Sequence, residues 1–393
     1  MAEADWSSLP KELIDLISQR LDVELDLIRF RSTCSTWRSS SISFPILTLK
    51  FPLPWPYQSS INNTTQFHSL SKRSFFLIKP PLQRPWLIRI TQNSNGKTKL
   101  LHPLLSYRSS HPLHFPHVLD FSQLYVLELG YDYIVDSEQR LHCDYIYPEK
   151  IVAVTCKEKK SLVIGTFIST LRPVLLKCDG VEKWNLITDI STYLGDICVF
   201  KGQAYVINRA GQTITVGPDD SNASLVAERP ESEPVVGNKK FLVESESKLL
   251  LVDIYDFLVL RIKVFRLDEK ARKWVKLTSL GDRVLFLGNG CSFSASASDL
   301  CVSKGNCVIF IDDAFLNFNG KYMQYGNCVF DLDQGQLLPL FDRPEYFNLF
   351  WPPTEWIHKC CVPNRVCCLA LFCLVSVVRL DNLFNCTRRN RKI

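Results

Sequence analysis

The feature that most constrains the fold of this 393-residue chain is a long succession of short apolar segments, which runs from Phe67 to Leu332. Most segments hold about four to eight residues rich in Val, Ile, Leu, Tyr and Phe, which is typical of β-strands. Pairs that favour tight turns, such as Lys201-Gly202 and Asn319-Gly320, lie between them. No helical period of useful length occurs, so the sequence predicts a sandwich, barrel or propeller.

The predicted strands are separated by turn signals, and a polar stretch from Pro218 to Asn238 interrupts them. They cover residues 74–79, 86–90, 124–129, 150–155, 162–168, 173–177, 196–200, 203–207, 212–216, 241–244, 249–254, 259–265, 284–287, 307–311 and 328–332.

Two similar segments about ninety residues apart favour the propeller among these folds. Residues 182–188 read EKWNLIT and residues 272–278 read RKWVKLT, and each is followed by a Gly-Asp pair and an apolar segment. Propeller blades commonly hold about 40 to 50 residues, so this separation corresponds to two blades. In such a ring Trp184 and Trp274 would fill equivalent positions between blades.

A different pattern occupies the N-terminal part of the chain. Pro10 suits the first position of a helix, where its missing N–H would stay unused, and Glu12 favours the helix dipole in the first turn. Apolar residues with helical spacing then share one face, at Leu9, Leu13, Leu16, Ile17 and Leu21. Two further short helices are predicted over 24–32 and 34–41, and Pro45 should end the last.

Three helices in so short a segment cannot bury a sizeable core, so their apolar surface favours a partner protein. The order and spacing of these residues resemble the F-box in its plant form. The resemblance is carried by Leu9-Pro10, Glu12-Leu13-Ile14, Ile17, Arg20-Leu21, Asp26-Leu27, Arg29-Phe30-Arg31-Ser32, Cys34 and Trp37-Arg38.

F-box proteins dock on a Skp-type adaptor, which links them to a cullin scaffold and a ubiquitin-conjugating enzyme. The resemblance therefore assigns adaptor contact to Leu9, Pro10, Leu13, Ile17, Leu21, Leu27, Phe30, Cys34 and Trp37. The alternative is that these residues pack only against each other or against the body. Ile14, Leu16 and Ile28 could be internal core rather than contact residues.

A second resemblance lies in the last third of the body. Residues 288–294, 304–310, 312–313, 329–332 and 349–357 resemble a plant family in which an F-box precedes a domain of unknown function that is similar to a β-propeller. This resemblance implies the architecture of a substrate receptor, and it names no substrate.

The predicted fold class is α+β and multidomain, with a small three-helix F-box before a large all-β domain of the propeller type. We divide the chain into an F-box at 1–44, a Pro-rich linker at 45–66, a propeller-like domain at 67–359 and a Cys-rich basic tail at 360–393. The uncharged run 366–378 is shorter than the roughly 20 residues that span a bilayer, so no membrane span is expected and a membrane partner is unlikely. Two alternatives are left for the tail, namely an interfacial segment or a closing strand.

Charge and cysteine content exclude several classes of function. The net charge is +6, and residues 360–393 carry +5 of it, so the body lacks the basic face that nucleic-acid binding needs. The fifteen cysteines include no C-x-x-C pair, which argues against a zinc ribbon. No secretory signal begins the chain, so we expect reduced cysteines and a location in the nucleus and/or cytoplasm.

The sequence contains no pattern that is typical of a catalytic or metal site. The Asp331-x-Asp333-x-Gly335 segment lacks the spacing of a calcium loop, and His111, His114 and His117 fit a polar loop better than a metal site. We therefore expect no catalytic centre, cofactor or metal.

The function predicted from these patterns is that of a non-catalytic substrate receptor in a Skp–cullin–F-box ubiquitin ligase, with an unknown target protein. One alternative is a propeller enzyme or small-molecule sensor whose turnover is controlled through the F-box. Another is a scaffold tethered by the basic tail.

Overall fold

The computed structural model describes most of the two predicted parts of the chain. The described residues are 6–21, 24–41, 51–52, 67–92, 98–104, 124–136, 150–155, 161–169, 172–178, 185–187, 194–216, 223–230, 239–256, 259–288, 290–310 and 327–351. The predicted tail 360–393, the three histidines between 111 and 117, and Trp184 lie outside these residues.

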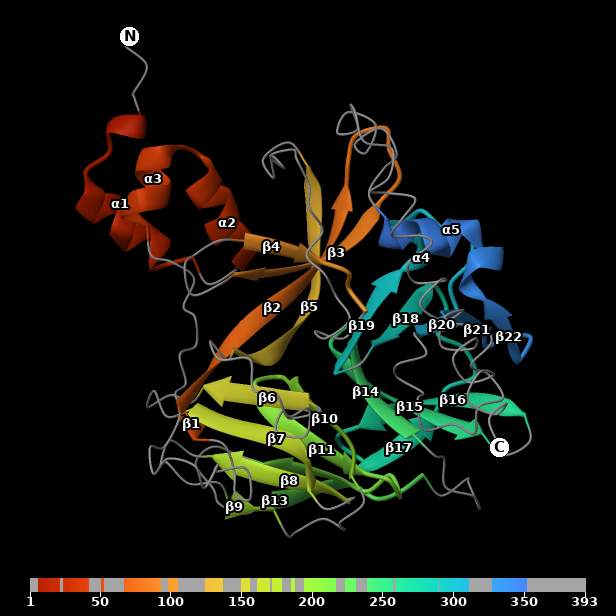
Figure 1. The fold of residues 1–393 in the computed structure, drawn as a ribbon. Coiled ribbons are helices and arrows are strands. Elements are labelled where there is room, and N and C mark those ends of the chain that lie inside the picture. The colour runs from red at the N-terminus through yellow and green to blue at the C-terminus, as the bar shows by residue number, and fades with distance from the viewer. Residues whose placement is uncertain are drawn as a thin grey trace, which may run out of the picture. The chain divides into compact units, whose positions relative to one another are not determined.

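The N-terminal part forms the predicted helices. A 3-10 turn η1 (Trp6–Ser8) precedes α1 (Lys11–Ser18), α2 (Glu24–Ser32) and α3 (Ser35–Ser40) (Figure 1). Pro10 stands at the N-cap of α1, and the Sγ of Cys34 caps α3 by accepting a hydrogen bond from the Trp37 N–H at 3.4 Å. Ile14, Leu25 and Leu27 are buried and form the small core of this module.

The described residues of the body form five antiparallel or mixed sheets. The first holds β1 (Phe51–Pro52), β2 (Phe67–Lys79), β3 (Trp86–Gln92) and β4 (Thr98–Leu101), with β5 (Tyr125–Asp136) also paired to β2. The second holds β6 (Lys150–Thr155), β7 (Ser161–Ser169), β8 (Arg172–Cys178) and β9 (Asn185–Leu186). The third holds β10 (Leu194–Phe200), β11 (Gln203–Asn208), β12 (Thr213–Val216) and β13 (Ala223–Ala227).

The last two sheets differ in how their strands are connected. The fourth is a simple meander of β14 (Lys239–Ser245), β15 (Lys248–Asp256), β16 (Leu260–Asp268) and β17 (Lys273–Lys276). The fifth has the order β19 (Cys291–Ser296), β18 (Arg283–Gly288), β20 (Cys307–Phe310), β21 (Cys328–Asp331) and β22 (Gln336–Pro339). Because β20 runs parallel to β18, the chain must cross over, and the short helix α4 (Ala297–Leu300) lies in that connection.

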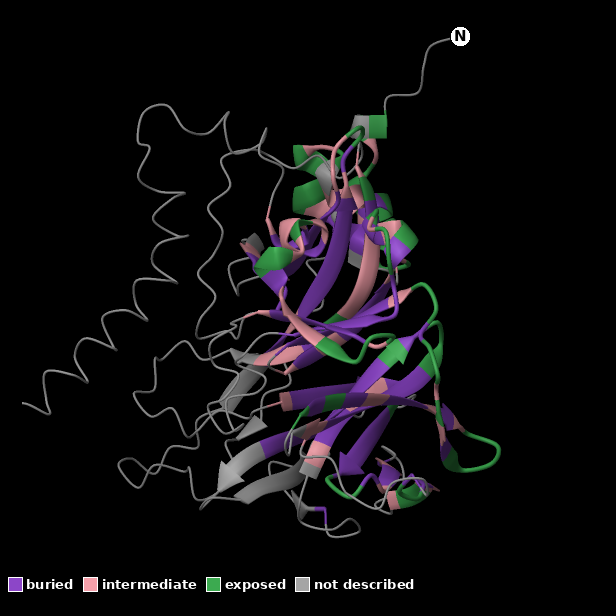
Figure 2. Cartoon of the chain, turned by 90° about the vertical axis from the view of Figure 1, so that its right-hand side faces the viewer, coloured by how far each residue is buried: buried purple, intermediate pink, exposed green. Residues whose placement is uncertain are grey.

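The five sheets form a closed ring, as in a β-propeller (Figure 1). Strands β5, β6, β10, β14 and β19 are the innermost of their sheets, and each neighbours the next around the ring until β19 meets β5. Apolar side chains fill the space between consecutive sheets, so the strands are largely buried (Figure 2). The structure therefore has five blades in its described residues, each covering its neighbours' apolar faces.

The prediction of a propeller is confirmed, and every predicted strand coincides with an observed one. The repeated segments lie at β9 and β17, which are the outer strands of the second and fourth sheets, so their separation does correspond to two blades. Trp274 is buried and its Nε1–H donates to the Oγ1 of Thr213 in the third sheet at 3.1 Å. This side chain thus links two blades, as expected.

Several strands were not predicted, for identifiable reasons. The outer strand β13 (Ala-Ser-Leu-Val-Ala) lies inside the stretch 218–238 that was read as polar, because its short apolar run is flanked by charged residues, prolines and other polar residues. The innermost strand β19 is rich in small residues, Ser-Phe-Ser-Ala-Ser, which suit its crowded place in the ring. Within the predicted linker 45–66, Phe51 and Pro52 pair with His68 and Phe67 of β2.

One carboxylate joins three innermost strands. Asp196 of β10 accepts hydrogen bonds from Lys150 Nζ of β6 and from the backbone N–H of Leu242 in β14, both at 2.8 Å. Burial by itself would lower the pKa of Lys150, but the Asp196 carboxylate outweighs that effect and the net pKa is raised. The second, third and fourth blades are therefore tied together by a charged, hydrogen-bonded pair.

The C-terminal described segment fastens the last blade to the first. After β22 come η4 (Leu340–Asp342), α5 (Pro344–Phe347) and η5 (Asn348–Phe350). Arg84 donates to the carbonyls of Asn348 and Trp351, and the ring of buried His102 stacks on Phe350 with centroids 5.2 Å apart. In the described part of the chain, no helix has the length and apolar content to span a membrane.

His102 makes this closure sensitive to acid. Its Nδ1 accepts a hydrogen bond from the Leu104 N–H at 3.2 Å, and burial together with nearby Arg89 lowers its pKa from 6.5 to about 3. The unfolded chain therefore binds a proton that the folded chain excludes. We predict that the free energy of unfolding falls by about 1.5 kcal/mol between roughly pH 6.5 and pH 5 through this group. Urea titrations at several pH values should show that the free energy of unfolding depends less on pH in His102→Asn than in the unaltered chain. Equal pH dependence in the two proteins would contradict the prediction.

Candidate functional site

Helix α1 carries an apolar surface that the module leaves uncovered. Ile14 is fully buried, whereas Leu13, Leu16 and Ile17 are 46%, 53% and 40% exposed. Trp6, just before the helix, is 67% exposed. Large apolar side chains that cluster in this way on a small module indicate a surface for another protein.

The residues predicted to contact an adaptor fall into three groups by exposure. Pro10, Leu13 and Ile17 are exposed, and Leu27 is buried in the module's core. The half-buried ones are Leu9, Leu21, Phe30, Cys34 and Trp37. The open surface is therefore centred on α1, while Leu27 supports it from inside.

Phe30 and Trp37 hold α2 and α3 together. Their ring centroids lie 4.4 Å apart, and the Trp37 Nε1–H donates to the Trp6 carbonyl at 3.0 Å. Their partial burial means that substitutions here would disturb folding as well as any surface. Leu16 and Trp6 were not assigned to the site from the sequence. The helical spacing of Leu16 with Leu13 was a sequence signal that Leu16 belongs to this surface. The side chain of Ile28 lies outside the described part of the chain.

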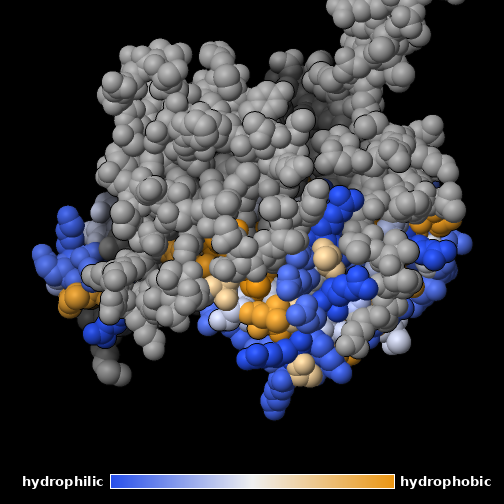
Figure 3. Space-filling view, turned by 90° about the horizontal axis from the view of Figure 1, so that it is seen from below, coloured by the Kyte–Doolittle hydropathy of each residue, from blue (hydrophilic) through white to orange (hydrophobic). Residues whose placement is uncertain are grey.

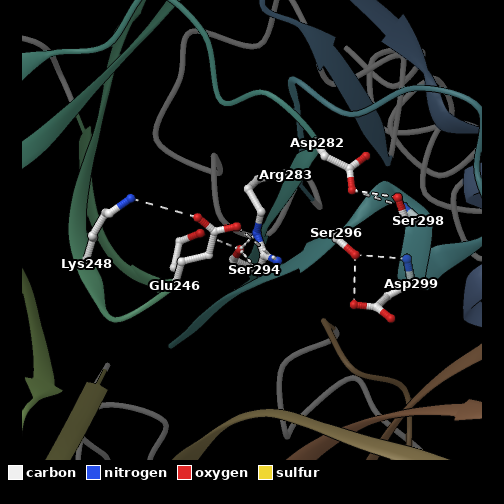
Figure 4. A network of polar contacts seen from close by, with 9 residues as sticks. Glu246, Lys248, Asp282, Arg283, Ser294, Ser296, Ser298 and Asp299 are labelled. Atoms are coloured by element: carbon white, nitrogen blue, oxygen red, sulfur yellow. Dashed lines mark hydrogen bonds and ion pairs between the residues drawn. The ribbon is translucent and has the colours of Figure 1, made fainter.

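The propeller carries a polar network where the fourth, fifth and first sheets approach each other (Figure 4). Arg283 at the start of β18 donates through Nε and Nη2 to the Ser294 hydroxyl at 2.9 and 2.6 Å, and its Nη1 lies 4.0 Å from Glu246. Glu246 also lies 3.9 Å from Lys248 in the next strand. These contacts join the turn between β14 and β15 to the fifth sheet.

The same network continues through Asp299 to the first sheet. Asp299 accepts hydrogen bonds from Lys79 Nζ and Ser296 Oγ, both at 2.8 Å. These two hydrogen bonds hold the pKa of Asp299 below its usual value. A carboxylate that is already paired and hydrogen-bonded is a poor acid or base, so this network orders the turns between blades rather than forming a catalytic centre.

The Asp331-x-Asp333 segment likewise forms a turn. Lys304 Nζ lies 2.8 Å from Asp331 and 2.9 Å from Asp333, and Asp331 also accepts from the N–H groups of Asp333 and Gln334. Within the described ranges, no group of three or more His, Cys, Asp or Glu side chains is placed to hold a metal ion. The described cysteines, which include Cys34, Cys198 and Cys291, are free thiols.

Comparison with known proteins finds two families that match this chain. Residues 59–331 match the family described as KIB1-4 β-propeller, and residues 6–49 match the F-box domain. F-box protein SKIP23 from Arabidopsis thaliana is 34% identical, over 90% of this chain and 95% of that protein. F-box protein At2g17036 from the same plant is 30% identical over the same shares of the two chains. A putative F-box/kelch-repeat protein from this plant is 29% identical, over 90% of this chain and 98% of its own length.

Neighbouring positions on α1 should respond differently to truncation. We predict that Ile14→Ala destabilises the helical module by about 2–4 kcal/mol, because it leaves a cavity in a small core. Leu13→Ala should change stability by less than about 0.5 kcal/mol, because that side chain already faces solvent. Hydrogen exchange of the α1–α3 amides in the full-length chain measures both values. Equal losses would mean that the two side chains are buried alike.

Proposed function

Because this chain belongs to the KIB1-4 β-propeller family and carries an F-box, we propose that it is the substrate-receptor subunit of a Skp–cullin–F-box ubiquitin ligase. F-box domains in general bind Skp-type adaptors. In this proposal the F-box holds the adaptor, the adaptor connects to the cullin scaffold, and the propeller recruits a target protein.

The observation that carries the proposal is the uncovered apolar surface of α1. Leu13 and Ile17 project from a helix whose buried apolar side chain, Ile14, belongs to the core. Burying such side chains against a partner releases free energy that the isolated module does not gain. Pro10 lies at the start of the same helix and is exposed beside them.

The propeller supports the second half of the proposal. Its blades share cores with their neighbours and are tied by paired charges such as Lys150–Asp196, so it can hold a docked target in a fixed place. A receptor of this kind needs no catalytic group, because it raises the effective concentration of the target near the ubiquitin donor held by other subunits. We place this activity in the nucleus and/or cytoplasm.

The adaptor contact can be tested with substitutions that leave the core intact. We predict that the double variant Leu13→Asp, Ile17→Asp weakens binding of a purified Skp-type adaptor by about a hundredfold or more, because two charges would enter an apolar interface. Biolayer interferometry with full-length protein measures the affinity. Val259→Asp is the matched control, since Val259 is 60% exposed on the propeller.

The control should bind the adaptor like the unaltered chain. Adaptor binding that persists in the double variant would exclude α1 as the contact surface. A folded full-length chain that binds no Skp-type adaptor at all would contradict the proposed function.

A further inference from the structure

The β16–β17 hairpin of the fourth blade concentrates positive charge. Residues 261–276 hold seven basic residues and two acidic ones, a net +5, while the whole chain carries only +6. The basic residues are Arg261, Lys263, Arg266, Lys270, Arg272, Lys273 and Lys276. Five of them, Arg261, Lys270, Arg272, Lys273 and Lys276, are exposed. No other stretch of the described propeller of this length is so basic.

The two acidic residues of the hairpin are occupied elsewhere. Glu269 pairs at 2.6 Å with Lys201, which lies in the turn between β10 and β11 of the third blade. Asp268 accepts a hydrogen bond from the Ala271 N–H at 2.9 Å and so closes the hairpin's own turn. Neither carboxylate therefore neutralises the surrounding cations of the hairpin.

Five of the hairpin's seven cations lie away from the described carboxylates. Among the described residues, no carboxylate lies within 4.0 Å of the charged groups of Arg261, Arg266, Lys270, Arg272 or Lys273. Elsewhere on the propeller, exposed or half-exposed lysines do have such partners, as in Lys79–Asp299 and Lys304–Asp331. The hairpin thus presents positive charge that an external anionic group can pair with.

The strand β17 lies at the edge of the described fourth sheet. It is the last strand of its sheet, and in the part of the chain that the structure describes it pairs only with β16. Trp274 points into the protein, whereas Lys273 and Lys276 are exposed and Val275 is half-buried. Where Figure 3 colours this face by hydropathy, hydrophilic side chains surround smaller hydrophobic groups. An edge strand can add an extended peptide through main-chain hydrogen bonds, and side chains then determine which peptide fits.

We propose that the β16–β17 hairpin is a docking surface for an acidic, extended segment of the target protein. This inference rests on the proposed receptor function and adds the chemistry of the target. Lysines on an edge strand also hinder pairing with neutral or basic strands, and an acidic strand is the kind that they attract. An edge strand with one short basic hairpin favours a peptide over a nucleic acid, which needs phosphate contacts along a longer path.

The test uses full-length protein and a fluorescein-labelled decapeptide of alternating Glu and Val, with fluorescence anisotropy as the readout. The double variant Arg272→Glu, Lys273→Glu should weaken binding by about tenfold or more, because two attractions become repulsions. Raising the salt from about 50 to 300 mM should also weaken binding, because exposed charges are screened. A peptide with Gln in place of Glu should bind at least about tenfold more weakly.

The matched control is Arg209→Glu, Lys248→Glu, which changes the net charge equally at two exposed positions, one in the turn between β11 and β12 and one at the start of β15. It should alter peptide binding by less than about twofold. Equal losses in both variants, no loss in the hairpin variant, or tighter binding of a single-stranded RNA than of the acidic peptide would overturn the inference. Circular dichroism shows whether each variant is folded.

Adaptor binding is measured on the same preparations. If both variants bind a Skp-type adaptor but the hairpin substitutions leave peptide binding unchanged, only the docking surface is refuted. If the unaltered chain fails to bind the adaptor, the proposed function itself fails.

Discussion

The propeller depends on the core that its first and last sheets share. Phe75 of β2 stacks on Phe293 of β19 with ring centroids 4.9 Å apart, and Phe286 stacks on the other side of Phe293 at the same separation. Among the described sheets, the first and the last are the neighbours that lie farthest apart in sequence. The entropy lost in closing so long a loop must be offset by a large buried surface. Arg84 adds hydrogen bonds across the same junction.

A closed ring also explains where charge is buried and where apolar surface remains exposed. Inside the propeller, buried charges are paired, as in Lys150–Asp196 and Arg73–Asp132, because an unpaired buried ion would be strongly destabilising. On the F-box, by contrast, Leu13 and Ile17 stay in solvent although they are apolar. The described sheets of the propeller bury one another's apolar side chains. The small helical module instead has an apolar surface that a partner can cover. This difference is the physical basis for the proposal that the F-box binds the adaptor and the propeller binds the target.

The sequence predicted much of this arrangement and missed parts of it for physical reasons. Apolar strands such as β6 and β15 can be recognised in the sequence as continuous apolar runs, because both of their faces are buried. The short β13 is surrounded by polar sequence, and β19 is rich in serine, so neither stands out in this way. On the F-box, the family resemblance assigned Leu27 and Leu13 to the same contact, although one is buried and the other exposed, since that difference depends on how α1 and α2 pack. The basic residues of β16 and β17 could be counted from sequence, but which of them are exposed depends on the fold.

The central claim is that the apolar surface of α1 is the adaptor contact and that the propeller is left free for a target. Hydrogen exchange with mass spectrometry, on the full-length chain with and without a Skp-type adaptor, tests it most directly. We predict added protection of amides in α1 (Lys11–Ser18) and the adjoining helices, with unchanged exchange in the strands of the propeller. Protection that appeared in the propeller strands and spared α1 would contradict the account.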